Sequence, residues 1–205
     1  MTLAVVAALA PSALANGAGG CGLATAHVVF RGAGAVVVRE SSGAYGSDGP
    51  TYACLASKPA LRTPIDKGNL VTQDPADQVR LGAFAARGSM LAVGLAYGDG
   101  SAYLEVVDLA TRAKVVEVHG VPETDTYLGD PAVSAVALGA DGQFAWIVAG
   151  SLEPGLKSAA RQVLARDATG VKILDSSAKI APRSLRLSGG AVSWSDGGTA
   201  MSARA

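Results

Sequence analysis

The chain has 205 residues, and 49% of them are hydrophobic. This length allows one domain with a sizeable core, and the hydrophobic content is too high for a disordered chain. Lys plus Arg and Asp plus Glu both number 17, so the formal net charge is zero. Nucleic-acid-binding domains usually carry a clustered basic surface, so we expect no nucleic-acid partner.

The first fifteen residues resemble a secretory signal peptide. Residues 2–15 form an apolar stretch that ends in Ala13-Leu14-Ala15, and signal peptidase accepts small residues at these positions. We expect cleavage after Ala15, although the basic region that normally opens a signal peptide is absent. A buried apolar strand or helix is the alternative. The stretch is too short to span a bilayer, and no other reaches the roughly 20 apolar residues of a membrane helix.

Residues 16–23 are expected to be a flexible leader that contains Cys21, and Cys54 lies in a later strand pattern. An exported chain enters an oxidising compartment, so we predict a Cys21–Cys54 disulfide. Two buried thiols are one alternative. Lipidation of Cys21 is another, although Ala18 stands where a lipoprotein signal usually has Leu.

From residue 24 onward the sequence predicts an all-β domain, because short apolar and β-branched runs alternate with Gly-, Pro- and Asp-rich turns. The runs fall into four groups, which we expect to be antiparallel four-stranded meanders with the last one incomplete. The predicted strands are 26–31, 35–40, 51–56 and 60–65; one within 74–88, then 90–97, 103–109 and 114–118; 133–138, 144–148, 162–167 and 171–174; and 184–187, 191–194 and 200–203.

One segment, residues 74–88, is ambiguous. Asp74 and Pro75 could cap and open a helix. Gly82 lies in the middle of the segment, however, and Val79 and Leu81 begin an alternating pattern that favours a strand.

The third group is the clearest. Ala140-Asp-Gly142 separates two apolar runs, which predicts a hairpin, and the turn at 168–170 predicts a second one. When the second strands of the groups are aligned, Val37, Ala92, Ala145 and Ser193 recur at intervals near 50 residues, as propeller blades do. Residues 107–115 and 166–173 also match, since each has a strand ending in Asp, a turn containing Thr, and a strand after Lys.

These strand–Asp–turn–strand units resemble the blades of secreted bacterial β-propellers of the TolB-like, YVTN and WD-repeat type. Residues 182–205 also resemble the ends of many exported actinobacterial proteins. The resemblance covers residues 24–205 and implies a small propeller-like fold of about four blades in an extracytoplasmic location. It implies no catalytic residue, because those families share no common site. The leader could close the last blade; an open ring would need a partner chain or a covering loop.

No catalytic, cofactor-binding or metal-binding residue is predicted. His27 and His119 lack metal-ligand spacing, and no nucleophile elbow accompanies them. Asp-Gly pairs at 48, 99, 141 and 196 are explained by turn chemistry, with calcium as the alternative. Trp146 and Trp194 occupy matching positions and are expected to be packing residues, with a sugar-stacking platform as the alternative.

The leading hypothesis is a secreted, non-enzymatic module that binds a protein or glycan partner through its loops. The loops expected to bind are 41–50, 66–78 and 120–131. Two alternatives remain open: a secreted hydrolase or lyase on a propeller scaffold, and a structural protein of the cell envelope. Scarce histidines and the lack of paired carboxylates count against an enzyme.

Overall fold

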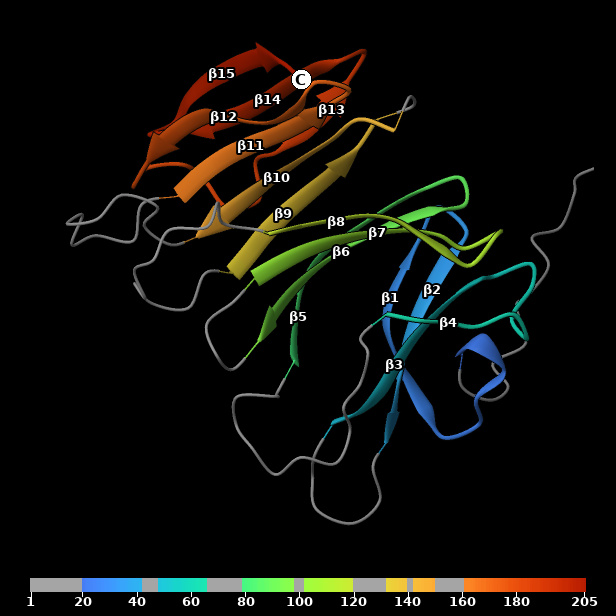
Figure 1. Ribbon diagram of the computed structural model, residues 1–205. Coiled ribbons are helices and arrows are strands. Elements are labelled where there is room, and N and C mark those ends of the chain that lie inside the picture. The colour runs from blue at the N-terminus through green and yellow to red at the C-terminus, as the bar shows by residue number, and fades with distance from the viewer. Residues whose placement is uncertain are drawn as a thin grey trace, which may run out of the picture.

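The computed structural model describes residues 20–41, 48–65, 79–97, 102–119, 132–139, 142–149 and 161–205. The predicted signal peptide, the first half of the leader, and most of the three loops expected to bind lie outside these residues. The described chain is all-β, as predicted, and folds into four antiparallel sheets (Figure 1). None of the described helices is long and apolar enough to cross a membrane.

Each sheet is a meander in which consecutive strands pair. The first sheet contains β1 (Ala26–Gly32), β2 (Ala35–Ser41), β3 (Asp48–Leu55) and β4 (Thr63–Pro64), preceded by the short 3-10 helix η1 (Gly20–Gly22). The second contains β5 (Val79–Arg87), β6 (Met90–Tyr97), β7 (Ala102–Asp108) and β8 (Ala113–His119). The third contains β9 (Ala132–Leu138), β10 (Phe144–Ala149), β11 (Arg161–Asp167) and β12 (Gly170–Ser177), and the fourth contains β13 (Arg186–Ser188), β14 (Ala191–Asp196) and β15 (Thr199–Arg204).

The ambiguous segment forms a strand, β5, and its glycine has a packing reason. β9 crosses closely over β5 and β6. A Cβ atom on Gly82 would lie 2.6 Å from the carbonyl oxygen of Val133, and one on Gly94 would lie 2.5 Å from the Cβ of Val133. The two glycines therefore allow the second and third sheets to approach each other.

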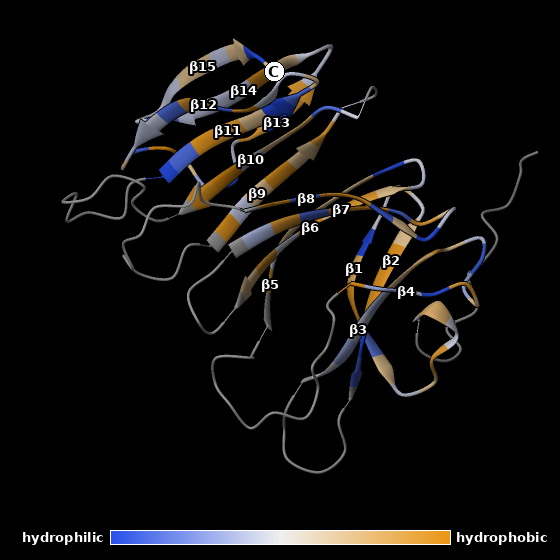
Figure 2. Ribbon diagram, in the orientation of Figure 1, coloured by the Kyte–Doolittle hydropathy of each residue, from blue (hydrophilic) through white to orange (hydrophobic). Residues whose placement is uncertain are grey.

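The sheets stack face to face, with an apolar layer between each neighbouring pair. Val37 of β2 packs toward the second sheet, Ala92 of β6 belongs to the layer shared with the third sheet, and Ala145 of β10 belongs to the layer shared with the fourth. These are the positions that the sequence alignment pairs. Figure 2 shows hydrophobic residues along β9 and β10, at the centre of this stack. The predicted meander order is confirmed in each sheet, and in the first three the aligned positions face the following sheet.

The two outer faces of the stack differ. The outer face of the first sheet is apolar and carries Val36, Val38 and Cys54, which Cys21 of the leader covers. Gly20 lies so close that a Cβ atom there would be 2.8 Å from Cγ1 of Val38. The outer face of the fourth sheet is polar instead, and its residues at the paired positions are Arg186, Ser188, Ala191, Ser193, Ser195, Ala200, Ser202 and Arg204.

The fourth sheet has three strands within the described chain, and its first strand is interrupted at Pro182. Ile180 forms an isolated bridge with Asp196 before the break, and β13 resumes the pairing after it. The hydroxyl of Ser184 accepts a hydrogen bond from the backbone N–H of Ser195, which holds the break in place. Gly20–Gly22 lies against the first sheet and not at the edge of the fourth, and no described strand joins these two sheets into a ring.

Candidate functional site

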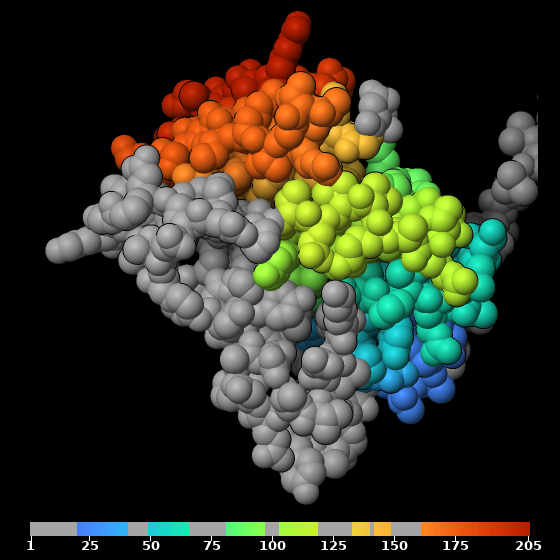
Figure 3. All heavy atoms as spheres, viewed as in Figure 1, coloured from blue at the N-terminus to red at the C-terminus, as the bar shows by residue number. Residues whose placement is uncertain are grey.

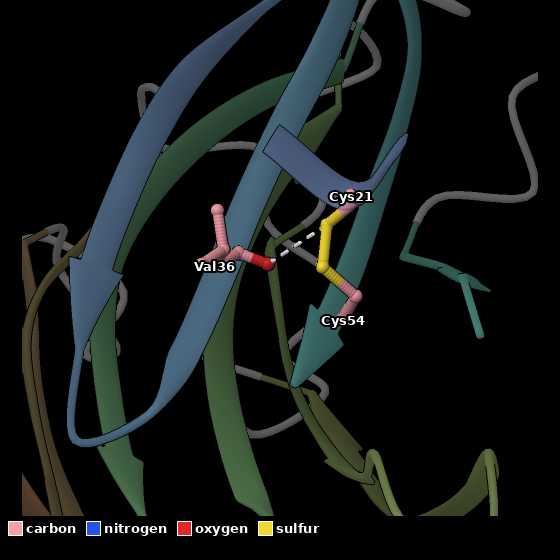
Figure 4. The surroundings of a disulfide bond; sticks show 3 residues. All are labelled: Cys21, Val36 and Cys54. Carbon is pink, nitrogen blue, oxygen red and sulfur yellow. Dashed lines mark hydrogen bonds between the residues drawn. A yellow bond between two sulfur atoms is a disulfide. The ribbon is translucent and has the colours of Figure 1, made fainter. Parts of the chain in front are cut away.

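The predicted disulfide is present and is buried at the outer face of the first sheet (Figure 4). Cys21 belongs to η1 and Cys54 to β3, and they are 33 positions apart in the chain. The Sγ atom of Cys21 lies 3.5 Å from the carbonyl oxygen of Val36. A bond closing a loop of this size stabilises a fold by about 3–4 kcal/mol. The disulfide holds the leader against the apolar outer face of the first sheet.

A cleft of about 220 Å³ lies between the first and second sheets and contains charged residues within a largely apolar lining. The residues that line it come from β4 and its end on one side and from β7, β8 and their turn on the other: Thr63, Pro64, Ile65, Glu105, Val107, Arg112 and Lys114. Figure 3 shows residues of β8 lying directly against those of the first sheet on one face of the molecule. Four of the seven lining residues can form hydrogen bonds, although most of the surface that they present to the cleft is apolar.

Glu105 occupies a position that the repeat otherwise gives to the core. It is the cross-strand partner of Val93 on β6 and is only 5% exposed. The matching pair in the third sheet is Trp146 and Leu164, both fully buried. Both pairs face the preceding sheet. A carboxylate thus stands in the second sheet where the third has a leucine.

Lys114 neutralises this buried carboxylate. Its Nζ atom lies 3.2 Å from Oε2 of Glu105 and also contacts Glu117, the cross-strand partner of Glu105. Partial burial by itself would lower the pKa of Lys114, but the hydrogen bond to Glu117 and the charge of Glu105 outweigh it and raise the pKa. Lys114 therefore stays charged at neutral pH.

Arg112 lies at the mouth of the cleft in a backbone conformation that favours glycine. Its φ is 61°, a positive value shared by only two other described non-glycine residues. The matching residue in the third sheet is Gly170, which also has a positive φ. Both follow a threonine whose hydroxyl donates to the aspartate that ends the preceding strand, Thr111 to Asp108 and Thr169 to Asp167. An arginine here costs about 1 kcal/mol that glycine avoids.

Thr63 supplies a polar atom without a partner. The residue is 6% exposed, and its Oγ1 atom forms no hydrogen bond within the described chain. Leaving a buried hydroxyl unpaired costs about 1–3 kcal/mol. This oxygen has almost no accessible surface and does not open into the cleft, whereas Arg112 is exposed at its mouth, beside the Glu105–Lys114 ion pair.

A second cleft, of about 360 Å³, lies between the second and third sheets and is largely apolar. Met90, Val106 and Phe144 line it, together with the half-exposed Val115. The guanidinium of Arg166 lies 5.7 Å from the centre of the Phe144 ring. Its walls continue the apolar layer between these sheets, and we assign it no ligand.

The residues singled out in the sequence are not gathered into a site. His27 is exposed on β1, and His119 is the last residue of β8. Trp146 is fully buried, and Trp194 is 5% exposed with its Nε1 donating to Oδ2 of Asp175, so neither offers a stacking platform. The described residues contain no group of three or more His, Cys, Asp or Glu able to hold a metal ion.

Sequence reasoning missed Glu105, Arg112 and Thr63. A signal for Arg112 existed in the sequence, because the matching turns align this arginine with Gly170.

No protein-family model matches the chain, and a search of curated proteins finds no similar one.

Proposed function

We propose that this protein is an exported, non-enzymatic glycan-binding module built on a β-propeller-like scaffold. Four meanders in series support the scaffold, together with the way that β5 packs against β9 and β9 against β13, first strand to first strand. Propellers place the first strand of each blade around a common axis. The leader covers the outer face of the first sheet, and the outer face of the fourth sheet is polar. Neither face needs another sheet packed against it, which favours an open arc of four sheets.

Export is supported by two features. The apolar segment before Ala15 has the small residues of a signal peptidase site. The disulfide between Cys21 and Cys54 is of the kind that persists in oxidising compartments.

The observation that carries the binding function is the buried carboxylate of Glu105 at a core position of the repeat. A leucine serves the same position in the third sheet, so packing alone does not require a charge there. Replacing a buried ion pair by apolar residues is often neutral or stabilising. A glutamate at this position, with Lys114 beside it and the exposed Arg112 at the mouth of the cleft, is suited to recognising a polar ligand.

The test is a calorimetric titration of the mature protein with neutral and acidic saccharides of one to four sugar units. We expect binding by the wild-type chain and loss of at least tenfold in affinity in Glu105→Leu. Val115→Ala is the matched control, since it alters the apolar cleft, and it should bind as the wild type does. No saccharide bound by the wild type, or unchanged binding by Glu105→Leu, would contradict the proposal.

A further inference from the structure

The fourth sheet lacks the last strand that each of the other three sheets has. Those sheets contain four described strands each, whereas the fourth ends at β15, at the top of Figure 1. Within the described chain, no strand pairs with the outer edge of β15. Its residues, Thr199–Arg204, pair with β14 without a bulge and include neither proline nor lysine. A regular edge of this kind is a template for another strand.

The last strands of the other three sheets are protected at their edges. β4 is only two residues long, and one of them is Pro64. β8 and β12 each contain a bulge, where Val115 and Leu174 have no partner in the pairing register. Short strands, prolines and bulges hinder the addition of a further strand. Because β15 has none of these features, its edge is the one suited to pairing.

The backbone groups that β15 offers follow from its pairing with β14. The N–H of Ala205, one position beyond β15, donates to the carbonyl oxygen of Gly190 at 2.9 Å. In antiparallel sheets, alternate residues of a strand bond to opposite neighbours. Every second residue counted back from Ala205 therefore bonds to β14. The residues between them, whose N–H and C=O groups point to the free edge, are Ala200, Ser202 and Arg204.

Met201 is the side chain that an added strand would cover. It is the cross-strand partner of Trp194, as Leu164 is of Trp146 in the third sheet. Leu164 pairs in turn with Ile173 of β12 and is fully buried. Met201 has no such neighbour among the described strands and is 40% exposed. An apolar residue in a place equivalent to that of Ile173 would remove Met201 from water.

The charge of the fourth sheet favours a different protein over a second copy of this chain. The charged residues on its outer face are Arg186 and Arg204, and no acid lies among the described residues of that face. Two copies joined through β15 would place two positively charged faces side by side. A strand with an acidic residue on this face would be attracted instead, because opposite charges on neighbouring strands stabilise their pairing.

We propose that β15 binds an extended strand of a partner protein, which runs antiparallel to it as the fourth strand of the last sheet. The strand carries an apolar residue opposite Met201 and an acidic residue opposite Arg204. Main-chain hydrogen bonds supply affinity in this mode of recognition, and the alternating side chains supply specificity. This interface goes beyond the proposed glycan-binding function and lies on a different sheet from Glu105, so the two proposals can fail separately.

The probe is a capped synthetic peptide, Glu-Val-Thr-Ile-Thr. Its residues are designed to lie, in that order, opposite Arg204, Ala203, Ser202, Met201 and Ala200. Amide hydrogen exchange of the mature protein, followed by NMR, measures its binding. With saturating peptide, exchange at Ala200, Ser202 and Arg204 should slow by about tenfold or more. Exchange at Met201 and Ala203 should change little, because their N–H groups already bond to β14.

Three variants and a second peptide complete the experiment. Ser202→Pro removes an N–H that points away from β14, so it should keep its thermal stability and lose the peptide. Ser202→Ala keeps that N–H and is the matched control, which should bind as the wild type does. Met201→Ser should bind the peptide severalfold more weakly, because the apolar contact is lost. A peptide with Lys in place of Glu should also bind more weakly, and added salt should reduce the difference.

Four outcomes would overturn the inference in distinguishable ways. Absence of peptide binding, or unchanged binding by Ser202→Pro, refutes strand addition at β15. Slow exchange at Ala200 and Ser202 in the free protein that depends on protein concentration assigns the edge to a second copy. Slow exchange there that is independent of concentration assigns the edge to a segment of the same chain. Equal binding of the two peptides refutes the acidic residue in the partner strand.

Discussion

The second and third sheets follow one plan and differ where they face their preceding neighbour. Each has an aspartate-anchored turn between its outer two strands, and each places its central strands in register. In the third sheet that face presents Leu164 beside Trp146, and the turn has Gly170. In the second it presents Glu105, and the turn has Arg112. The fold requires the shared features, so the polar differences point to a task other than folding.

The largest expected effect comes from giving the third sheet the residue of the second. Leu164 is fully buried, and Lys172, which the matching turns align with Lys114, is paired with Asp167 instead. Leu164→Glu should lower the free energy of unfolding by about 4 kcal/mol or more, because it buries a charge without a partner. Urea unfolding measures this. Leu164→Met is the control and should cost less than about 1.5 kcal/mol. A loss below about 1 kcal/mol in Leu164→Glu would show that the third sheet tolerates a carboxylate on this face as well as the second sheet does.

A smaller effect is expected at the two turns. Arg112→Gly should leave the free energy of unfolding unchanged or raise it by up to about 1 kcal/mol, because glycine takes a positive φ without strain. Gly170→Ala should lower it by about 1–2 kcal/mol for the same reason, since a Cβ there meets no atom within 4 Å and only the backbone is strained. Thermal unfolding of each variant and of the wild type measures these two changes in stability. A marked loss of stability in Arg112→Gly would mean that Arg112 serves the fold.

The smallest effect concerns the aspartates that the two turns share. Hydrogen bonds from Ser89 and from the backbone N–H of Ala110 lower the pKa of Asp108, and those from Thr169 lower that of Asp167. A carboxyl group with a lowered pKa in the folded state stabilises that state above its unfolded pKa, and this stabilisation is lost as the pH falls. We expect stability to decline below about pH 4.

Asp108→Asn and Asp167→Asn should each reduce this acid dependence slightly and by similar amounts, as measured by unfolding between pH 2 and 7. Both groups are partly exposed to solvent, which keeps the effect small. If the stability of both variants still declines at low pH as much as that of the wild type, other carboxyl groups cause the decline.

Much of the fold could be predicted from the sequence. Alternating apolar runs and Asp-Gly or Gly-Gly turns predicted the strands, and the interval between Val37, Ala92 and Ala145 predicted equivalent strands in successive sheets. That these residues also face the same way is a finding of the structure. Residues 60–65 were predicted as a strand, and only Thr63–Pro64 pairs. The stretch before it turns, with backbone bonds from Lys58 to Leu55 and from Leu61 to Lys58.

The candidate site could not be predicted, because it depends on which sheets come together. Tyr103, Glu105 and Val107 alternate along β7, so the sequence places them on one face. Nothing local shows that this face packs against the first sheet or that Thr63 meets it there. The leader likewise carries no strand pattern, and its contact with Val36 and Val38 follows from the disulfide.

The most direct test of the account is the stability of Glu105→Leu, which gives the second sheet the residue of the third. If Glu105 serves binding, urea unfolding should show a free energy of unfolding that is unchanged or raised by about 1 kcal/mol, because an apolar residue suits this layer and Lys114 keeps Glu117 as a partner. A loss of more than about 2 kcal/mol would show that the buried ion pair holds the two sheets together, and would contradict the central claim.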